Sequence, residues 1–338
     1  RIRELFCRCL ENTPPRPLKR DWKRFIYIWL DYCTWEELVV GDKDRASAGY
    51  RKCLNSIPNR HRHFSFSKIW IMAANLEIRR KNLGAARKIF GQALGMAPRQ
   101  KIFRSYLDLE LALGQIERAR KIARRWVEVD PSSVVGWQEY TKLEISLGEV
   151  DRARGIFELG VAQSELDLPE ILWRSFIEFE VAQGELERAR VLYRQLLERS
   201  QSAAIWIALA KFEAEFANTK ETARAIYREA DRTLALHMDE QEHGRANRYN
   251  ILRAWLEFEN ADILDGVDSK VVNEVREKQP RKVSRERPLR DSAGQIINYE
   301  EQVDYVFEED PEAKPHLKLL KVANEWKRRQ ALSINQPG

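Results

Sequence analysis

Between residues 102 and 198 the chain repeats one arrangement of apolar and polar positions three times. Each copy begins with an aromatic residue and continues with a second aromatic at +3, an apolar residue at +6, a glutamate at +7 and an Ala-Arg pair at +16 and +17. The lead residues are Phe103, Trp137 and Trp173. Self-similarity at about 34 residues is typical of a helical-repeat array.

The spacing within one copy predicts two helices. Positions 0, +3 and +6 fall on one side of an α-helix and form an apolar stripe that must be buried. A second stripe starts at the Ala-Arg pair and contains Ala189, Leu192 and Leu196 in the third copy. Between the stripes lies a joint with glycine, as at Gly114 and Gly148, which suits the left-handed residue that ends a helix. Each copy is therefore a hairpin that must stack on its neighbours, and we predict an all-α superhelical solenoid.

The same pattern extends over most of the chain and defines its expected organisation. Seven units are recognisable, led by positions 29, 70, 103, 137, 173, 206 and 252. We predict the end of a truncated repeat at 1–20, the repeat array at 21–262, a basic linker at 263–298, and an acidic segment with a terminal amphipathic helix at 299–338. Because the chain starts inside a helical pattern and without Met, we expect it to be a fragment preceded by further repeats.

The recurring tryptophans, glutamates and arginines favour a structural role over a binding one. We expect the tryptophans at lead positions to be core rather than an aromatic cage. We expect each +7 glutamate to form an ion pair with the arginine of its own hairpin, as Glu110 with Arg120, and so to set the register of the two helices. The predicted repeat-core signature is Trp70, Trp137, Trp173, Trp206, Glu110, Arg120, Glu144, Arg154, Glu180 and Arg190, with Glu213 and Arg224 completing the set.

Composition gives no support for catalysis or for a bound cofactor. The chain lacks the phosphate-binding, dinucleotide-binding, zinc-protease and nucleophile-elbow motifs, so we predict no enzyme, no cofactor, no metal and no small-molecule substrate. The pair His61 and His63 has no acidic or cysteine partner nearby in sequence and is interpreted as part of a loop. The four cysteines show no metal spacing, and we expect buried, unpaired thiols. No run approaches the length of a membrane span, so we predict no membrane association.

Charge is concentrated near the C-terminal end. Residues 270–290, here called the basic stretch, hold eight basic residues and three glutamates, which accounts for most of the formal net charge of +6. Three readings stay open: contact with RNA phosphates, a nuclear-localisation patch, and a charged linker. With its two prolines and few apolar residues, the segment 278–288 is expected to lack a core of its own. The candidate phosphate contacts are Lys278, Arg281, Lys282, Arg285, Arg287 and Arg290.

The basic stretch is followed by an acidic, aromatic segment at 299–310 and then by a short amphipathic pattern. Leu317, Leu320 and Trp326 share one face of the helix that this pattern predicts. The helix could dock into a partner or cap the array, and the residues alone do not choose between these roles.

The repeat resembles the HAT (half-a-tetratricopeptide) repeat, because glutamate follows the apolar +6 residue where the ordinary tetratricopeptide repeat has a different consensus. Several stretches resemble the crooked-neck family of pre-mRNA splicing factors more specifically. They are His63 to Trp70, Leu107 to Leu111, Leu166 to Glu180, Tyr299 to Glu301, Asp304 to Phe307, Leu317 to Leu320 and Trp326-Lys327. The basic stretch matches no motif of that family.

The resemblance implies a non-enzymatic nuclear scaffold of the spliceosome, associated with the nineteen complex and holding protein and small nuclear RNA components together. The implied partners are spliceosomal and nineteen-complex proteins, with small nuclear RNA or pre-mRNA as a further partner of the basic stretch. The alternatives are a HAT scaffold of another RNA-processing complex, such as pre-mRNA 3′-end processing, and a tetratricopeptide-type peptide-binding adaptor.

Overall fold

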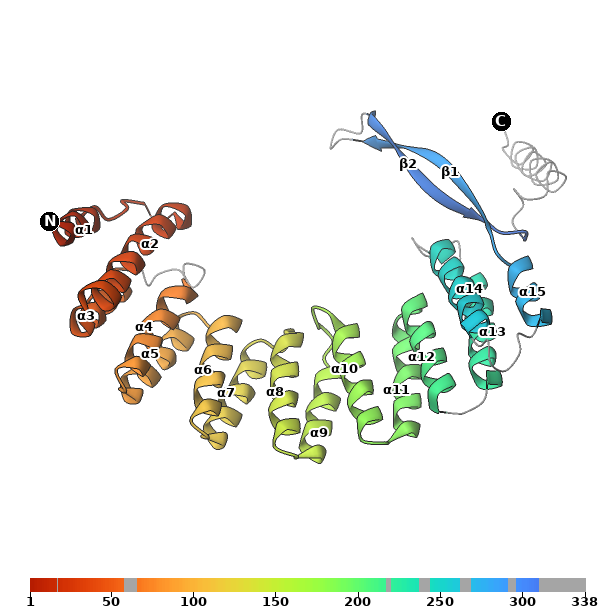
Figure 1. Cartoon of the computed structure of the whole chain (residues 1–338), viewed down its shortest axis with the longest axis horizontal. Coiled ribbons are helices and arrows are strands. Elements are labelled where there is room, and N and C mark those ends of the chain that lie inside the picture. Colours follow the sequence, from red (N-terminus) through yellow and green to blue (C-terminus); the bar gives the residue numbers. More distant parts are fainter. Residues whose placement is uncertain are drawn as a thin grey trace, which may run out of the picture. The chain divides into compact units, whose positions relative to one another are not determined.

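The computed structural model describes residues 1–16, 18–57, 66–216, 220–236, 244–261, 269–290 and 296–309. Within these ranges the chain forms fifteen α-helices, a short π-helix and one two-stranded sheet (Figure 1). The helices pack in consecutive pairs, which confirms the predicted all-α helical solenoid. The chain divides into two compact units, Arg1–Phe176 and Ile177–Gly338.

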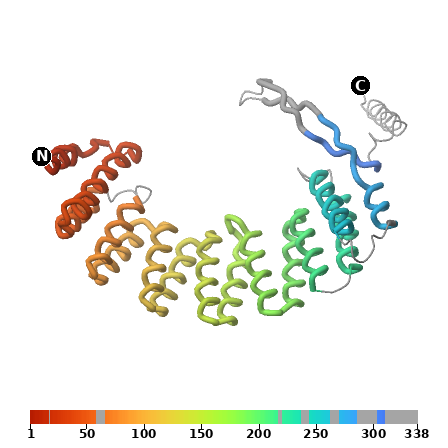
Figure 2. Tube along the Cα trace, viewed as in Figure 1, coloured from red at the N-terminus to blue at the C-terminus, as the bar shows by residue number. Residues whose placement is uncertain are grey.

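The first unit consists of one leading helix and successive hairpins. Helix α2 packs against α3, α4 against α5, α6 against α7, and α8 against α9, and the hairpins of α6–α9 can be followed along the trace in Figure 2. The helices are α1 (Ile2–Glu11), α2 (Lys19–Trp35), α3 (Lys43–Ser56), α4 (Ser67–Arg79), α5 (Leu83–Met96), α6 (Gln100–Ala112), α7 (Ile116–Val129), α8 (Val134–Ser146) and α9 (Val150–Val161). The π-helix Glu36–Val40 follows α2, and α10 (Pro169–Ala182) spans the boundary between the units.

The second unit continues with helix pairs and ends in a β-hairpin. Helix α12 packs against α13 and α14, and α14 packs against α15 and β2. The elements are α11 (Leu186–Arg199), α12 (Ala203–Phe216), α13 (Lys220–Leu236), α14 (Gly244–Ala261), α15 (Ser269–Glu277), β1 (Arg281–Arg290) and β2 (Ile296–Val306). The strands are antiparallel, with Arg281 opposite Val306 and Arg287 opposite Glu300.

The apolar stripes and joints lie where the spacing placed them. Trp70, Trp137, Trp173 and Trp206 are all at most 6% exposed, so they are core residues. The joint glycines have positive φ, 66° at Gly114 and 75° at Gly148, which is the left-handed backbone conformation that commonly ends an α-helix. Lys81 occupies the corresponding joint of the preceding hairpin with a φ of 61°.

The recurring ion pair joins successive hairpins, which corrects the predicted pairing within one hairpin. Glu110 accepts from Arg87 of the hairpin before it, with Nε–Oε1 at 2.7 Å and Nη2–Oε2 at 2.8 Å, and not from Arg120 of its own hairpin. Arg120 instead reaches Glu144 of the next hairpin at 2.9 and 2.8 Å. The +7 glutamate faces the preceding hairpin. The spacing therefore predicted its position in the helix correctly but its ion-pair partner wrongly.

The same arrangement recurs at both ends of the chain. The further pairs are Arg3–Glu36 in the first unit, and Arg190–Glu213 and Arg224–Glu259 in the second, all bidentate with distances between 2.6 and 3.0 Å. We call the inter-hairpin ion pairs, including Arg87–Glu110 and Arg120–Glu144, the ladder. Its glutamates are at most 8% exposed. Glu180 is also fully buried, and Arg154 hydrogen-bonds Asp151 on its own helix at 3.3 Å.

At Glu77 the inter-hairpin arginine of the ladder is replaced by other contacts. Where other hairpins carry the arginine of the Ala-Arg pair, Ser47 follows Ala46, and its hydroxyl donates to the buried carboxylate of Glu77. Arg80, one turn along the helix from Glu77, supplies the positive charge at 3.1 Å. Oε1 of this carboxylate is thus still bonded without the arginine, whereas the buried Oε2 has no hydrogen-bond partner among the described residues.

The aromatic residue at +3 also faces the preceding hairpin. Tyr106 stacks on Phe90 at 5.0 Å between ring centroids, and Phe176 stacks on Phe157 at the same distance. Positions +3 and +7 lie one turn apart on the same helix face. Helix α6 therefore contacts the previous hairpin through both an aromatic ring, Tyr106, and a carboxylate, Glu110.

The thiols only partly match the expectation of burial. All four are unpaired, and Cys33 and Cys53 are buried while Cys7 and Cys9 are exposed. Burial raises the pKa of Cys33 to about 12.

The first prediction concerns the partner of Glu110. The substitution Glu110→Gln should lower the free energy of unfolding by about 1–2 kcal/mol, because it removes the buried charge that Arg87 pairs with. The cost stays below that of a fully buried pair because the Arg87 side chain is 24% exposed and can regain water.

A pair of double-mutant cycles under urea unfolding identifies the partner. Glu110→Gln and Arg87→Gln should be coupled, whereas Glu110→Gln and Arg120→Gln should be additive because Arg120 pairs elsewhere. Coupling to Arg120 that equals or exceeds the coupling to Arg87 would show that the pair forms within one hairpin.

The second prediction concerns the left-handed joint at Lys81. Lys81→Gly should raise the free energy of unfolding by about 0.5–1 kcal/mol, since a left-handed backbone strains an L-residue by ~1–2 kcal/mol and the extra entropy of unfolded glycine offsets part of this. Gly114→Ala should instead lower the free energy of unfolding. An added Cβ meets nothing within 4 Å, so the left-handed φ is the source of the strain. Thermal unfolding of both variants measures this, and a loss of stability in both would contradict it.

Candidate binding surfaces

A buried arginine organises the C-terminal part of the second unit. Arg248 on α14 is 2% exposed and donates through Nε to Asp231 on α13 at 2.7 Å. Its two Nη groups reach Glu309 at 3.0 and 3.3 Å. Burial by itself would lower the pKa of Arg248, but the hydrogen bonds with Glu309 and Asp231 outweigh it and raise the pKa. Arg248 thus stays charged and ties the segment after β2 to the helices.

Aromatic contacts reinforce this attachment. Tyr305 stacks on Tyr249 of α14, with ring centroids 4.5 Å apart, and its carbonyl accepts from Arg245 at 3.0 Å. Phe307 is 1% exposed, and the Arg248 guanidinium carbon lies over its ring, 4.5 Å from the Phe307 ring centroid. An acidic, aromatic segment is therefore bound by a basic, aromatic helix face within the chain itself.

The basic stretch does not form the linker that its composition suggested. Its first part is α15, the helix that packs on α14, and its second part is strand β1, paired with the acidic strand β2. The predicted boundary at 262 therefore falls between two helices of one hairpin. The physical reason is that β2 supplies the backbone hydrogen-bond partners that β1 lacks alone, while Pro288 is tolerated in a two-stranded sheet.

Two of the candidate phosphate-binding side chains have partners inside the second unit. Lys278 bonds Glu274 at 2.9 Å, lies 3.7 Å from Asp231 and sits 5.8 Å from the ring centroid of Trp255. Lys282 sits over the ring of Tyr249 at 4.9 Å.

The other candidates are placed differently. Arg281 is exposed. Arg285, Arg287 and Arg290 lie on β1, opposite Gln302, Glu300 and Ile296 in the backbone register. Leu317, Leu320 and Trp326 of the predicted docking helix lie outside the described residues, as do His61 and His63.

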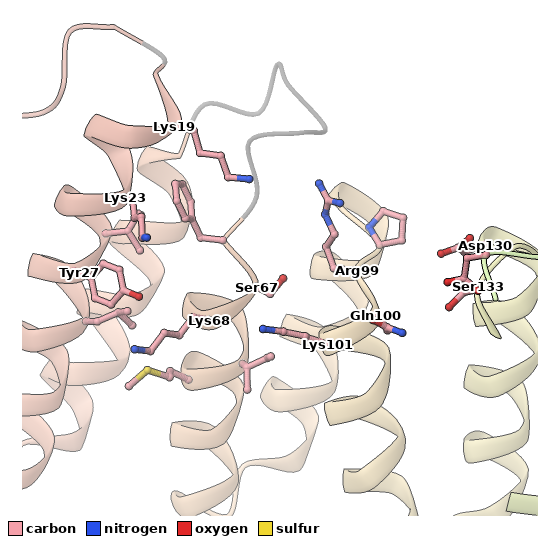
Figure 3. A pocket seen from close by; sticks show the side chains of 17 residues that line it. Lys19, Lys23, Tyr27, Ser67, Lys68, Arg99, Gln100, Lys101, Asp130 and Ser133 are labelled. Carbon is pink, nitrogen blue, oxygen red and sulfur yellow. The ribbon is translucent and has the colours of Figure 1, made fainter. Parts of the chain in front are cut away.

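A groove that sequence reasoning missed lies in the first unit. It has a volume of about 850 Å³ and is lined by the starts of α2, α4, α6 and α8. Figure 3 shows Lys19 and Lys23 on α2, Lys68 on α4, and Arg99 and Lys101 at the start of α6, with Asp130 and Ser133 at the start of α8. The available signal was a cation near the first position of three successive first helices, which is recognisable only once the helices are aligned.

Asp167, in the motif around Leu166–Glu170, stabilises this end of the array. Its carboxylate accepts from the backbone N–H of Val134 at 3.0 Å and of Leu168 at 2.9 Å, and its own N–H donates to the carbonyl of Ser132. It therefore holds the loop before α10 against the start of α8.

Two further classes of site are absent from the described ranges. These residues contain no group of three or more histidine, cysteine or acidic side chains placed to hold a metal ion. Nor does any helix among them have the length and apolar character needed to cross a membrane.

Comparisons with known proteins connect these features to a family. A family model described as the PRP39 N-terminal HAT repeat matches residues 98–214. The chain is 40% identical to Protein crooked neck of Drosophila melanogaster, with 99% of this chain and 48% of that protein covered. It is 40% identical to Crooked neck-like protein 1 of Homo sapiens, covering 97% and 38%, and 36% identical to Pre-mRNA-splicing factor clf1 of Aspergillus fumigatus, covering 97% and 49%.

None of these descriptions names an enzyme. The chain spans about half the length, or less, of the curated relatives that it matches. With the HAT repeat and this identity over nearly its whole length, the chain is a homologue of the crooked-neck family of pre-mRNA splicing factors.

Proposed function

We propose that this chain is part of a non-catalytic scaffold of the spliceosome, which acts in the nucleus and organises protein and small nuclear ribonucleoprotein components during assembly and activation. We further propose association with the nineteen complex. The observation that carries the proposal is the identity to splicing factors over nearly the whole chain, combined with the stacked helical hairpins.

The physics of the array supports a scaffold. Successive hairpins contact one another through ladder pairs, through stacked rings and through an apolar core that continues from one hairpin to the next. Surfaces away from the ladder are then available to several partners at once, and the grooves between hairpins can accept partner segments.

Protein contacts, rather than RNA, are proposed as the main attachment. Lys278 and Lys282 of the basic stretch contact side chains of the second unit, which reduces the charge left for phosphates. Arg281 is exposed, and RNA contact through it and its neighbours on β1 is the secondary proposal.

The third prediction tests these proposals by affinity purification. The tagged chain is recovered from nuclear extract with and without ribonuclease and its partners are identified by mass spectrometry. Spliceosomal and nineteen-complex proteins should be recovered in both samples, because protein contacts carry the attachment.

A charge-reversed variant separates the RNA tether from the protein contacts. Arg281→Glu with Arg285→Glu and Arg287→Glu should retain the same proteins, and so should a control with Lys88→Glu, Lys121→Glu and Arg124→Glu on exposed positions of the first unit. RNA would instead be the tether if the proteins were lost after ribonuclease treatment and were also lost from the β1 variant but not from the control variant. Recovery of 3′-end-processing factors or chaperones would overturn the proposal.

A further inference from the structure

The groove in the first unit concentrates positive charge at three helix starts. Lys19 and Lys23 lie in the first turns of α2, Lys68 is the second residue of α4, and Arg99 and Lys101 flank the first residue of α6. All five are exposed. Figure 3 shows their side chains near the starts of these three helices.

This placement works against helix stability. The start of a helix carries partial positive charge, so acidic side chains stabilise it and cations cost about 0.3–1 kcal/mol each. The N-cap residues that precede α2, α4 and α6, which are Leu18, Phe66 and Arg99, make no side-chain capping hydrogen bond. The next first helix, α8, has the usual arrangement, with a cap from Ser133 and the Asp167 carboxylate on Val134.

The five cations also lack ion-pair partners. Among the described residues, none of them lies within salt-bridge distance of a carboxylate. The two acids at the far end of the groove have other bonds: Asp130 accepts from the Ser132 hydroxyl at 2.8 Å, and Asp167 accepts from backbone N–H groups. The charge of the groove is therefore not balanced from within the described part of the first unit.

The floor of the groove is apolar, which limits what can bind. Ile26 and Leu30 of α2 are buried at its base, and Ile71 and Met72 of α4 are half-buried beside them. Tyr27 is the exposed aromatic side chain of the lining, and the Lys68 ammonium covers its ring at 4.8 Å from the centroid. A single-stranded nucleic acid stacks its bases on open aromatic faces, and the Lys68 ammonium occupies one face of this ring.

We propose that this groove binds an acidic segment of a partner protein, in which carboxylates alternate with apolar or aromatic side chains. The carboxylates pair with the cations at the three helix starts and accept from the uncapped N–H groups, while the apolar side chains cover the floor. The second unit shows the same chemistry, where Tyr305, Phe307 and Glu309 pack on Arg248 and Tyr249. This inference rests on the scaffold role proposed above, to which it adds a partner chemistry.

The fourth prediction is measured by fluorescence anisotropy with the purified chain. The probe is a short labelled peptide in which Glu and Asp alternate with Leu and Phe, and its control replaces the acids by Gln and Asn. The acidic peptide should bind and the control should not. The variant Lys68→Glu with Lys101→Glu should weaken binding at least about tenfold, because two attractive contacts become repulsive.

A matched variant controls for net charge. Lys88→Glu with Lys121→Glu makes the same charge change on exposed positions of α5 and α7, outside the groove, and should change the affinity less than about twofold. Circular dichroism confirms that both variants remain helical.

Three results would overturn the inference: no binding of the acidic peptide to the unmodified chain, equal loss in both variants, or an oligouridylate that binds with the same dependence on Lys68 and Lys101. These results do not depend on which complex the chain joins. If splicing proteins are not recovered but the acidic peptide binds, only the spliceosomal role is contradicted. If splicing proteins are recovered but the peptide does not bind, only the proposed role of the groove is contradicted.

Discussion

The interaction on which the array depends is a buried glutamate held by an arginine of the preceding hairpin, as in Arg87–Glu110 and Arg224–Glu259. A buried carboxylate is costly unless a charge and hydrogen bonds compensate it, so a hairpin that loses its predecessor keeps an unpaired charge in its core face. The constraint makes stacking obligatory and fixes the register between neighbours. At Ser47 the pair is rebuilt from a hydroxyl and Arg80, so the carboxylate is bonded even where the arginine is lost.

The ladder also explains which charges remain for partners. Its arginines are paired with buried carboxylates, so they are not available to partners. In the first unit, five of the exposed cations lie at the starts of the first helices, around the groove. In the second unit Arg248, Lys278 and Lys282 are used to attach the β-hairpin and the segment after it.

Two of the errors of sequence reasoning have one origin. Pairing Glu110 with Arg120 assumed that residues near in sequence meet, whereas both face neighbouring hairpins. Treating 263–298 as a linker assumed that composition reports structure, whereas β1 depends on a strand that follows it across residues 291–295. In both cases the partner is another segment, and local propensity carries no information about it. The cations of the groove were missed for the same reason.

The amino-acid sequence by itself determined the helical hairpin, its period, its core tryptophans, its left-handed glycine joints and the family resemblance. These follow from spacings of three, four and about 34 residues, which are properties of a single helix and of its repetition. Tertiary structure alone decided that Glu110 meets Arg87, that β1 pairs with β2, and that Lys19, Lys68 and Lys101 line one groove. Such contacts depend on which faces of separate elements meet, and that is set by packing.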